Sequence, residues 1–165
     1  MTLRVATDAD AEAVASLYIA SRKQDVAFAP LTHSEGEVHM WISQSLIPSG
    51  HVWVATQAEV IVAMMATSVR DRSGWIDQLY VAPGHTRRGY GSALVDLAKK
   101  ILPKPILLFS FLENHGARRF YERHGFVPER SSDGATNEER RPDILFRFTT
   151  TPEGHPRAGP NPCNT

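Results

Sequence analysis

The spacing of apolar residues along the chain changes repeatedly between the period of a strand and that of a helix. Short runs that are mostly apolar, or that alternate with polar residues, predict strands, whereas stripes at intervals of three and four residues predict helices. The predicted strands cover 3–6, 51–56, 60–69, 75–81, 106–111, 126–129 and 144–148, and the predicted helices begin after Thr7 and Thr32 and then cover 90–101 and 115–124.

Capping residues mark the limits of these helices. Thr7 with Asp10, and Thr32 with Glu35, have the spacing of an N-terminal capping residue and its acidic partner. Gly125 fits the end of the fourth helix, where a residue with a left-handed backbone is common. The first two helices should therefore start close to these threonines.

The order of elements, β-α-α-β-β-β-α-β-α-β-β, predicts a single α/β (α+β) domain. An antiparallel meander that leads into two strand–helix crossovers gives a mixed sheet with helices on both faces. The domain should comprise residues 1–148. Residues 149–165 are rich in Pro and Gly and almost without apolar side chains, so we expect a disordered tail.

Composition excludes several classes of protein. The 165 residues contain 18 Lys and Arg against 18 Asp and Glu, and a nucleic-acid-binding protein usually carries a basic excess. No apolar run approaches the length of a membrane span, and no signal peptide is recognisable. Since Cys163 is the one cysteine, no internal disulfide can form. We expect a cytoplasmic protein without a membrane or nucleic-acid partner.

The segment after the strand 75–81 indicates a phosphate-binding loop. Two arginines (Arg87, Arg88) and two glycines (Gly89, Gly91) lead directly into a predicted helix, whose free N–H groups and dipole favour an anion. A dinucleotide-binding fingerprint would need a small residue in place of Leu94, and the Gly-Lys-Ser/Thr of a P-loop is absent. The alternative interpretation is an ordinary surface turn.

A second segment, from Glu113-Asn114 through Ala117 and Phe120-Tyr121-Glu122 to Gly125-Phe126, follows the next strand. Together with the Leu-x-Val-x-Pro strand and the Arg-rich Gly-x-Gly loop, it resembles the GCN5-related N-acetyltransferase (GNAT) superfamily. This resemblance spans residues 3–148. It implies transfer of an acetyl group from acetyl-coenzyme A to an amine.

The resemblance also implies a role for individual residues. The backbones of Leu79 and Val81 should pair with the pantetheine arm, in a V-shaped gap between the parallel strands 75–81 and 106–111. Asn114 should bind the same arm. Tyr121 should lie by the sulfur as the general acid, and the Leu79 N–H is the candidate oxyanion donor. The pyrophosphate should bind Thr86, Arg87, Arg88, Gly89, Tyr90, Gly91 and Ser92, with Thr86 standing where the family usually has Gln or Arg.

Other residues have two interpretations each. Tyr121 could be a core aromatic. Asp77 lies in an apolar strand, where alternation places it with Trp75 and Leu79 on one face; it is either a structural partner or the base that deprotonates the amine. Glu35 and His39 share a helix face but lack a third ligand, so no metal is expected. Three acids in or after the loop 130–142 are expected to be solvated or to contact a cationic acceptor: Glu138, Glu139 and Asp143.

Three hypotheses about function follow. The first is an N-acetyltransferase that moves acetyl directly to the primary amine of a small molecule, without an acyl-enzyme, because Cys163 is in the tail and no Ser-His-Asp arrangement is recognisable. The second is a non-catalytic acyl-coenzyme A sensor. The third is a protein or peptide acetyltransferase. The resemblance is compatible with a homodimer, which is common in this superfamily.

Overall fold

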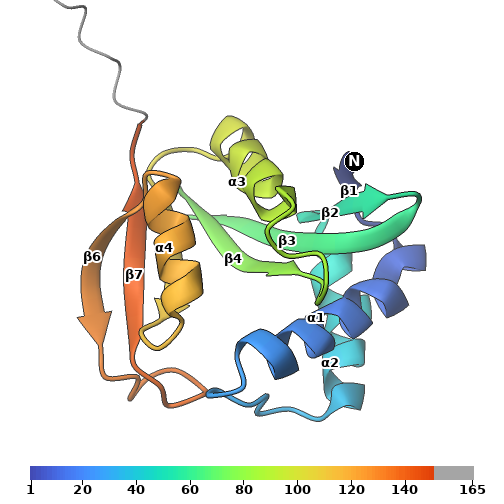
Figure 1. Ribbon diagram of the computed structural model, residues 1–165, viewed down its shortest axis with the longest axis horizontal. Coiled ribbons are helices and arrows are strands. Elements are labelled where there is room, and N and C mark those ends of the chain that lie inside the picture. Colours follow the sequence, from blue (N-terminus) through green and yellow to red (C-terminus); the bar gives the residue numbers. More distant parts are fainter. Residues whose placement is uncertain (151–165) are drawn as a thin grey trace, which may run out of the picture.

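A seven-stranded sheet forms the centre of the computed structural model, which describes residues 1–150 (Figure 1). The strand order is β1-β2-β3-β4-β5-β7-β6, and every neighbouring pair is antiparallel except β4–β5, which is parallel. The predicted mixed sheet is therefore confirmed. The strands are β1 (Thr2–Val5), β2 (Val52–Gln57), β3 (Val60–Arg70), β4 (Ser73–Val81), β5 (Ile106–Phe111), β6 (Val127–Ser132) and β7 (Asp143–Phe148).

Helices cover both faces of the sheet, as predicted. Helices α1 (Ala11–Asp25) and α2 (Glu35–Trp41) pack on one face, and α3 (Tyr90–Ile101) and α4 (His115–Arg123) pack on the other. Each face has its own apolar core, which buries the stripe of the helices that cover it. No helix within residues 1–150 is long and apolar enough to cross a membrane.

Strands β4 and β5 separate soon after they begin. Their parallel pairing comprises Gly74 with Ile106 and Trp75 with Leu107 and then ends. Gly74 is needed at this junction because a Cβ there would lie 2.7 Å from the Leu102 Cβ. The predicted splay of the two strands is thus confirmed, and it leaves an edge of β4 without a neighbouring strand.

A β-bulge in β4 changes which side chains share a face. Ala66 of β3 pairs with Gln78 and the next residue, Thr67, pairs with Ile76, so Asp77 is an extra residue. Ile76 and Leu79 consequently contact the same core, although they are three residues apart. The predicted grouping of Asp77 with Leu79 is wrong, because simple alternation does not allow for a bulge.

The start of α2 also differs from the prediction. Ser34 rather than Thr32 caps this helix: its Oγ accepts a hydrogen bond from the Glu37 N–H at 3.2 Å, and the Glu37 carboxylate accepts one from the Ser34 N–H at 2.7 Å. The same Ser/Thr-x-x-Glu signature occurs in both registers, and the structure uses the later one. Thr149 and Thr150 form no helix or strand; the rest of the predicted tail, with Cys163, lies outside the described residues.

Candidate active site

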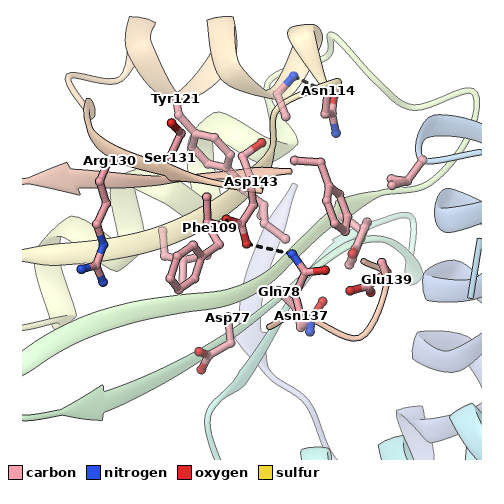
Figure 2. A pocket seen from close by; sticks show the side chains of 18 of the residues that line it. Asp77, Gln78, Phe109, Asn114, Tyr121, Arg130, Ser131, Asn137, Glu139 and Asp143 are labelled. Carbon is pink, nitrogen blue, oxygen red and sulfur yellow. Dashed lines mark hydrogen bonds between the residues drawn. The ribbon is translucent and has the colours of Figure 1, made fainter. Parts of the chain in front are cut away.

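A pocket of about 680 Å³ opens where β4 and β5 diverge (Figure 2). The two strands form its floor, α4 forms one wall, and β6 with the loop 133–142 forms the opposite side. Among the residues that line it are Leu79, Asn114 and Tyr121, which the sequence assigned to the cofactor site, and Asp77. The fold therefore brings residues of β4 and of α4 with its N-cap to one cavity.

Tyr121 extends from α4 into this pocket (Figure 2). The residue is only 8% exposed, and its ring packs edge-on against Phe120 and Phe126, with centroids 5.2 and 5.8 Å away. Burial raises the pKa of the phenol above its usual value. The ring therefore belongs to the core, and the residue also lines the pocket with a protonated hydroxyl.

The two polar atoms of the Asn114 side chain have different surroundings. Its Oδ1 accepts a hydrogen bond from the Ala117 N–H at 3.1 Å and so caps α4. The Nδ2 group makes no side-chain hydrogen bond within residues 1–150, and the residue lines the pocket. Asn114 can thus donate to a ligand carbonyl while its other amide atom fixes the helix.

The backbone of β4 faces the gap at Leu79 and Val81. The Ala82 N–H donates to the Val62 carbonyl at 2.8 Å, so Val81 and its partner Ala63 form a non-hydrogen-bonded pair. The N–H and C=O groups of Val81, and of Leu79 two residues earlier, consequently point away from β3. Ser21 of α1 donates to the Val81 carbonyl at 3.0 Å, which leaves that oxygen one further lone pair.

The loop before α3 has the backbone shape expected of an anion site. Gly89 caps the helix with a left-handed φ of 88°, and Arg87 is also left-handed at 61°. Thr86, Arg87 and Arg88 are exposed. A Cβ on Gly91 would lie 3.3 Å from the Phe120 ring, so this glycine serves the packing of α3 on α4. The free N–H groups of the first turn of α3 are the donors available here.

Two side chains of this loop point elsewhere. Tyr90 is buried, and its hydroxyl donates to Gln57. The Ser92 Oγ lies 3.0 Å from the His124 Nε2, and burial lowers the pKa of His124, so this imidazole is neutral at pH 7. Tyr90 can serve a phosphate through its backbone N–H, whereas the Ser92 hydroxyl is held by His124.

Asp77 lies at the outer edge of the pocket. Its carboxylate accepts a hydrogen bond from the Arg70 guanidinium at 2.8 Å, and that guanidinium stacks over the Trp75 ring at 4.1 Å. The Asp77 side chain is 31% exposed. One oxygen of this proposed base is therefore engaged with an arginine.

The sequence analysis missed Arg22, which fixes the loop 133–142. This guanidinium is only 5% exposed, donates to the Ala29 carbonyl at 2.9 Å, and bonds the Glu139 carboxylate at 3.2 Å. The expectation that Glu139 is a solvated charge is wrong, because a buried arginine requires a partner. An arginine in the apolar stripe of α1, after Tyr18 and Ser21, was the available signal.

The remaining candidates lie apart from the pocket. Glu35 pairs with Lys23, and His39 lies 3.4 Å from Glu12. Glu138 is exposed and accepts a hydrogen bond from Thr32. Within the described part of the chain, no three His, Cys, Asp or Glu side chains form a group that could hold a metal ion.

Comparisons with known proteins agree with this arrangement. The family model described as Acetyltransferase (GNAT) family matches residues 14–126, which is more than half of the chain. A search of the curated proteins gives no match.

Solved structures with the same fold are numerous. The PaiA N-acetyltransferase from Thermoplasma acidophilum, in complex with coenzyme A, superposes with a TM-score of 0.71 at 18% identity and covers 90% of this chain and 98% of its own. Ard1 from Thermoplasma volcanium superposes with a TM-score of 0.71 at 19% sequence identity, and the match covers 91% of this chain and 97% of Ard1. The ribosomal-protein-S18-alanine N-acetyltransferase from Escherichia coli superposes with a TM-score of 0.65 at 20% sequence identity, and the match covers 93% of this chain and 97% of that protein. At such identities the likeness shows the fold.

Proposed function

This chain belongs to the acetyltransferase (GNAT) family and is an acyltransferase, and we propose that it acetylates the primary amine of a small molecule, with acetyl-coenzyme A as the donor. The choice of a small-molecule acceptor depends on the loop 133–142, which lines the pocket. An ion pair between Glu139 of this loop and Arg22 joins the loop to α1. A peptide acceptor needs an open groove, and an ion pair that ties this loop to α1 beside the pocket favours a smaller acceptor.

Three features of the chain support binding of acetyl-coenzyme A. The outward N–H and C=O groups of Leu79 and Val81 can pair with the amides of an extended arm, as an added strand would. The Asn114 Nδ2 provides a further donor in the gap. The first turn of α3, with Gly89, Arg87 and Arg88, provides N–H groups and positive charge for the pyrophosphate.

We propose that the acetyl group passes directly from coenzyme A to the amine, without an acyl-enzyme intermediate. The neutral amine nitrogen attacks the thioester carbon, a C–N bond forms, and the carbonyl oxygen takes up negative charge opposite the Leu79 N–H. The C–S bond then breaks, coenzyme A leaves as a thiolate, and the surplus amine proton passes to a carboxylate. Within residues 1–150 the pocket lining contains no cysteine and no histidine that could serve a covalent route.

Two carboxylates at the pocket are candidates for receiving the amine proton. Asp77 is the residue proposed from the sequence, and Arg70 holds one of its oxygens. Asp143 of β7 accepts hydrogen bonds from the Ser132 hydroxyl at 2.5 Å and the Asn137 amide at 3.1 Å. Replacement of each by asparagine distinguishes the two roles.

Tyr121 is proposed to help the sulfur leave. Because burial raises its pKa, the phenol is a weak acid, and it assists by donating a hydrogen bond that strengthens as charge develops on the sulfur. Full proton transfer from an ordinary phenol to a thiolate is already uphill by roughly 2 kcal/mol in water. The raised pKa makes complete transfer still less favourable.

A thioester-consumption assay tests the proposal. Amines, amino acids, aminoglycosides, polyamines and N-terminal peptides are offered with acetyl-coenzyme A, and calorimetry measures binding of coenzyme A itself. We expect turnover with a small amine. Binding without turnover on any acceptor would support the sensor hypothesis. Turnover with peptides alone would support a protein substrate, as the name of the Escherichia coli ribosomal-protein-S18-alanine N-acetyltransferase states for that protein.

A further inference from the structure

Two charged side chains of opposite sign on the proposed acceptor side of the pocket have no ionic partner within residues 1–150. Among residues 1–150, no Lys, Arg or His nitrogen lies within 4.0 Å of the Asp143 carboxylate, and no carboxylate lies within that distance of the Arg130 guanidinium. The other charged residues that line the pocket are paired, Asp77 with Arg70 and Glu139 with Arg22. Asp143, which accepts hydrogen bonds only from the neutral Ser132 and Asn137, and Arg130 are therefore the charged groups of the pocket without an ionic partner in the described part of the chain.

The register of the sheet places these two groups on one face. Leu145 of β7 pairs with Arg130 on one side and with Phe109 on the other. Asp143 lies two residues earlier in β7, so its side chain is on the same face as that of Leu145. Strand geometry separates the Cα atoms of Arg130 and Asp143 by roughly 8 Å. A single small molecule can reach both side chains over that distance.

An exposed aromatic ring lies on the same face of the sheet, across β7 from Arg130. Phe109 lines the pocket, is 53% exposed, and stacks on Trp75 with ring centroids 5.7 Å apart. Phe109 lies on β5 and Asp143 on the neighbouring β7, and Figure 2 shows the ring at the end of the pocket away from Asn114. An apolar surface of this kind favours contact with an apolar part of a ligand.

We infer that the acceptor is a zwitterion of the amino-acid class, with its amine at Asp143, its carboxylate at Arg130 and an apolar side chain on Phe109. This inference rests on the proposed acetyltransferase function and narrows its substrate. A carboxylate suits the planar guanidinium, which can donate to both oxygens. A polyamine would instead bring a second positive charge towards Arg130, which pairs with no acid within residues 1–150.

The test compares L-phenylalanine with phenethylamine, which lacks only the carboxylate. The ratio of their kcat/KM values is measured in the wild type, in Arg130→Gln and in Arg147→Gln. Arg147 is a matched control, because it lies on β7, pairs with Glu129 at 3.6 Å and does not line the pocket. Differences in the intrinsic reactivity of the two amines cancel when the ratios are compared between variants.

We expect the wild type to prefer the amino acid by at least about tenfold, as one bidentate charged contact allows. Arg130→Gln should reduce this preference about tenfold, Arg130→Lys should keep part of it, and Arg147→Gln should leave it unchanged. Thermal midpoints check that the variants fold. A wild type that prefers phenethylamine, or a preference that survives in Arg130→Gln, overturns the inference.

A failure of this inference is distinguishable from a failure of the proposed function. If neither probe is acetylated, calorimetry measures binding of the two compounds to the wild type with coenzyme A present. Tighter binding of L-phenylalanine that depends on Arg130 supports the inference, whereas equal binding or none overturns it. The proposed function fails separately, if coenzyme A does not bind or if no amine in the broad panel consumes the thioester.

Discussion

The Glu139 carboxylate accepts a hydrogen bond from the buried Arg22 guanidinium at 3.2 Å, across 117 positions of sequence. This contact joins the loop 133–142, which lines the pocket, to α1. Removing the carboxylate leaves a buried cation whose neighbours include the neutral Ala29 carbonyl, Phe111 ring and Tyr80 side chain.

We therefore predict that Glu139→Gln lowers the free energy of unfolding by about 1–3 kcal/mol, since an unpaired buried charge is costly while the amide still accepts a hydrogen bond. It should also raise the KM of the acceptor more than that of acetyl-coenzyme A. Glu138→Gln is the control, because Glu138 is exposed. Urea unfolding and steady-state kinetics measure both effects; equal behaviour of the two variants would show that the loop is not held by Glu139.

Gly89 is predicted to be required for the pyrophosphate. A valine at its φ of 88° is strained by about 1–2 kcal/mol and shifts the first turn of α3. We expect Gly89→Val to raise the KM of acetyl-coenzyme A several-fold. Gly84→Val carries a comparable strain, at φ 83°, in the preceding turn. If both variants weaken calorimetric binding of coenzyme A equally, the effect is one of stability and not of phosphate contact.

Tyr121→Phe removes the hydroxyl and keeps the ring in the core. We predict a turnover number at least about tenfold lower, with little change in the affinity for coenzyme A. The loss should shrink with an acyl donor whose thiol is more acidic, because its thiolate needs less assistance. Stopped-flow measurement with both donors gives the comparison, and identical losses would leave Tyr121 as a packing residue only.

Asparagine variants separate the two proposed proton acceptors. If Asp77 receives the amine proton, Asp77→Asn should lower kcat about 10²-fold or more and change the pH profile, since removal of a general base typically costs this much. Asp143→Asn should then affect chiefly the KM of the acceptor. The reverse pattern in the kcat and KM profiles would assign the proton transfer to Asp143. Full activity of Asp77→Asn at neutral pH would exclude Asp77 as the proton acceptor.

Asp10 makes stability depend on acid pH. The Arg4 guanidinium, at 2.7 Å, and the Thr7 N–H lower the pKa of this carboxyl to about 2, against 3.8 for the free group. A lowered pKa means that its contribution is present at neutral pH and is lost as the pH falls from about 4 to about 2; because solvent screens this pair near the surface, that contribution is about 1 kcal/mol. Asp10→Asn should therefore be less stable at pH 7 and show a flatter stability profile below pH 4, measured by urea unfolding.

Local sequence determined most of the elements and part of the site. The period of the apolar residues, together with breakers such as Gly125, is a property of neighbouring positions, so the strands and helices could be predicted within a few residues. The same holds for the loop before α3, where Gly89 is the left-handed residue that starts the helix. Tyr121 was assigned to the pocket by the motif that surrounds it, and it lies there.

Only the tertiary structure decided what depends on residues far apart in the chain. The bulge at Asp77 exists because β4 pairs with β3 in a particular register, and it moved Leu79 to the face of Ile76. The partner of Arg22 and the ionic groups left at Arg130 and Asp143 depend on where the loop 133–142 comes to rest. Such contacts are selected by the energy of the assembled fold, in which burying a charge without a partner is costly.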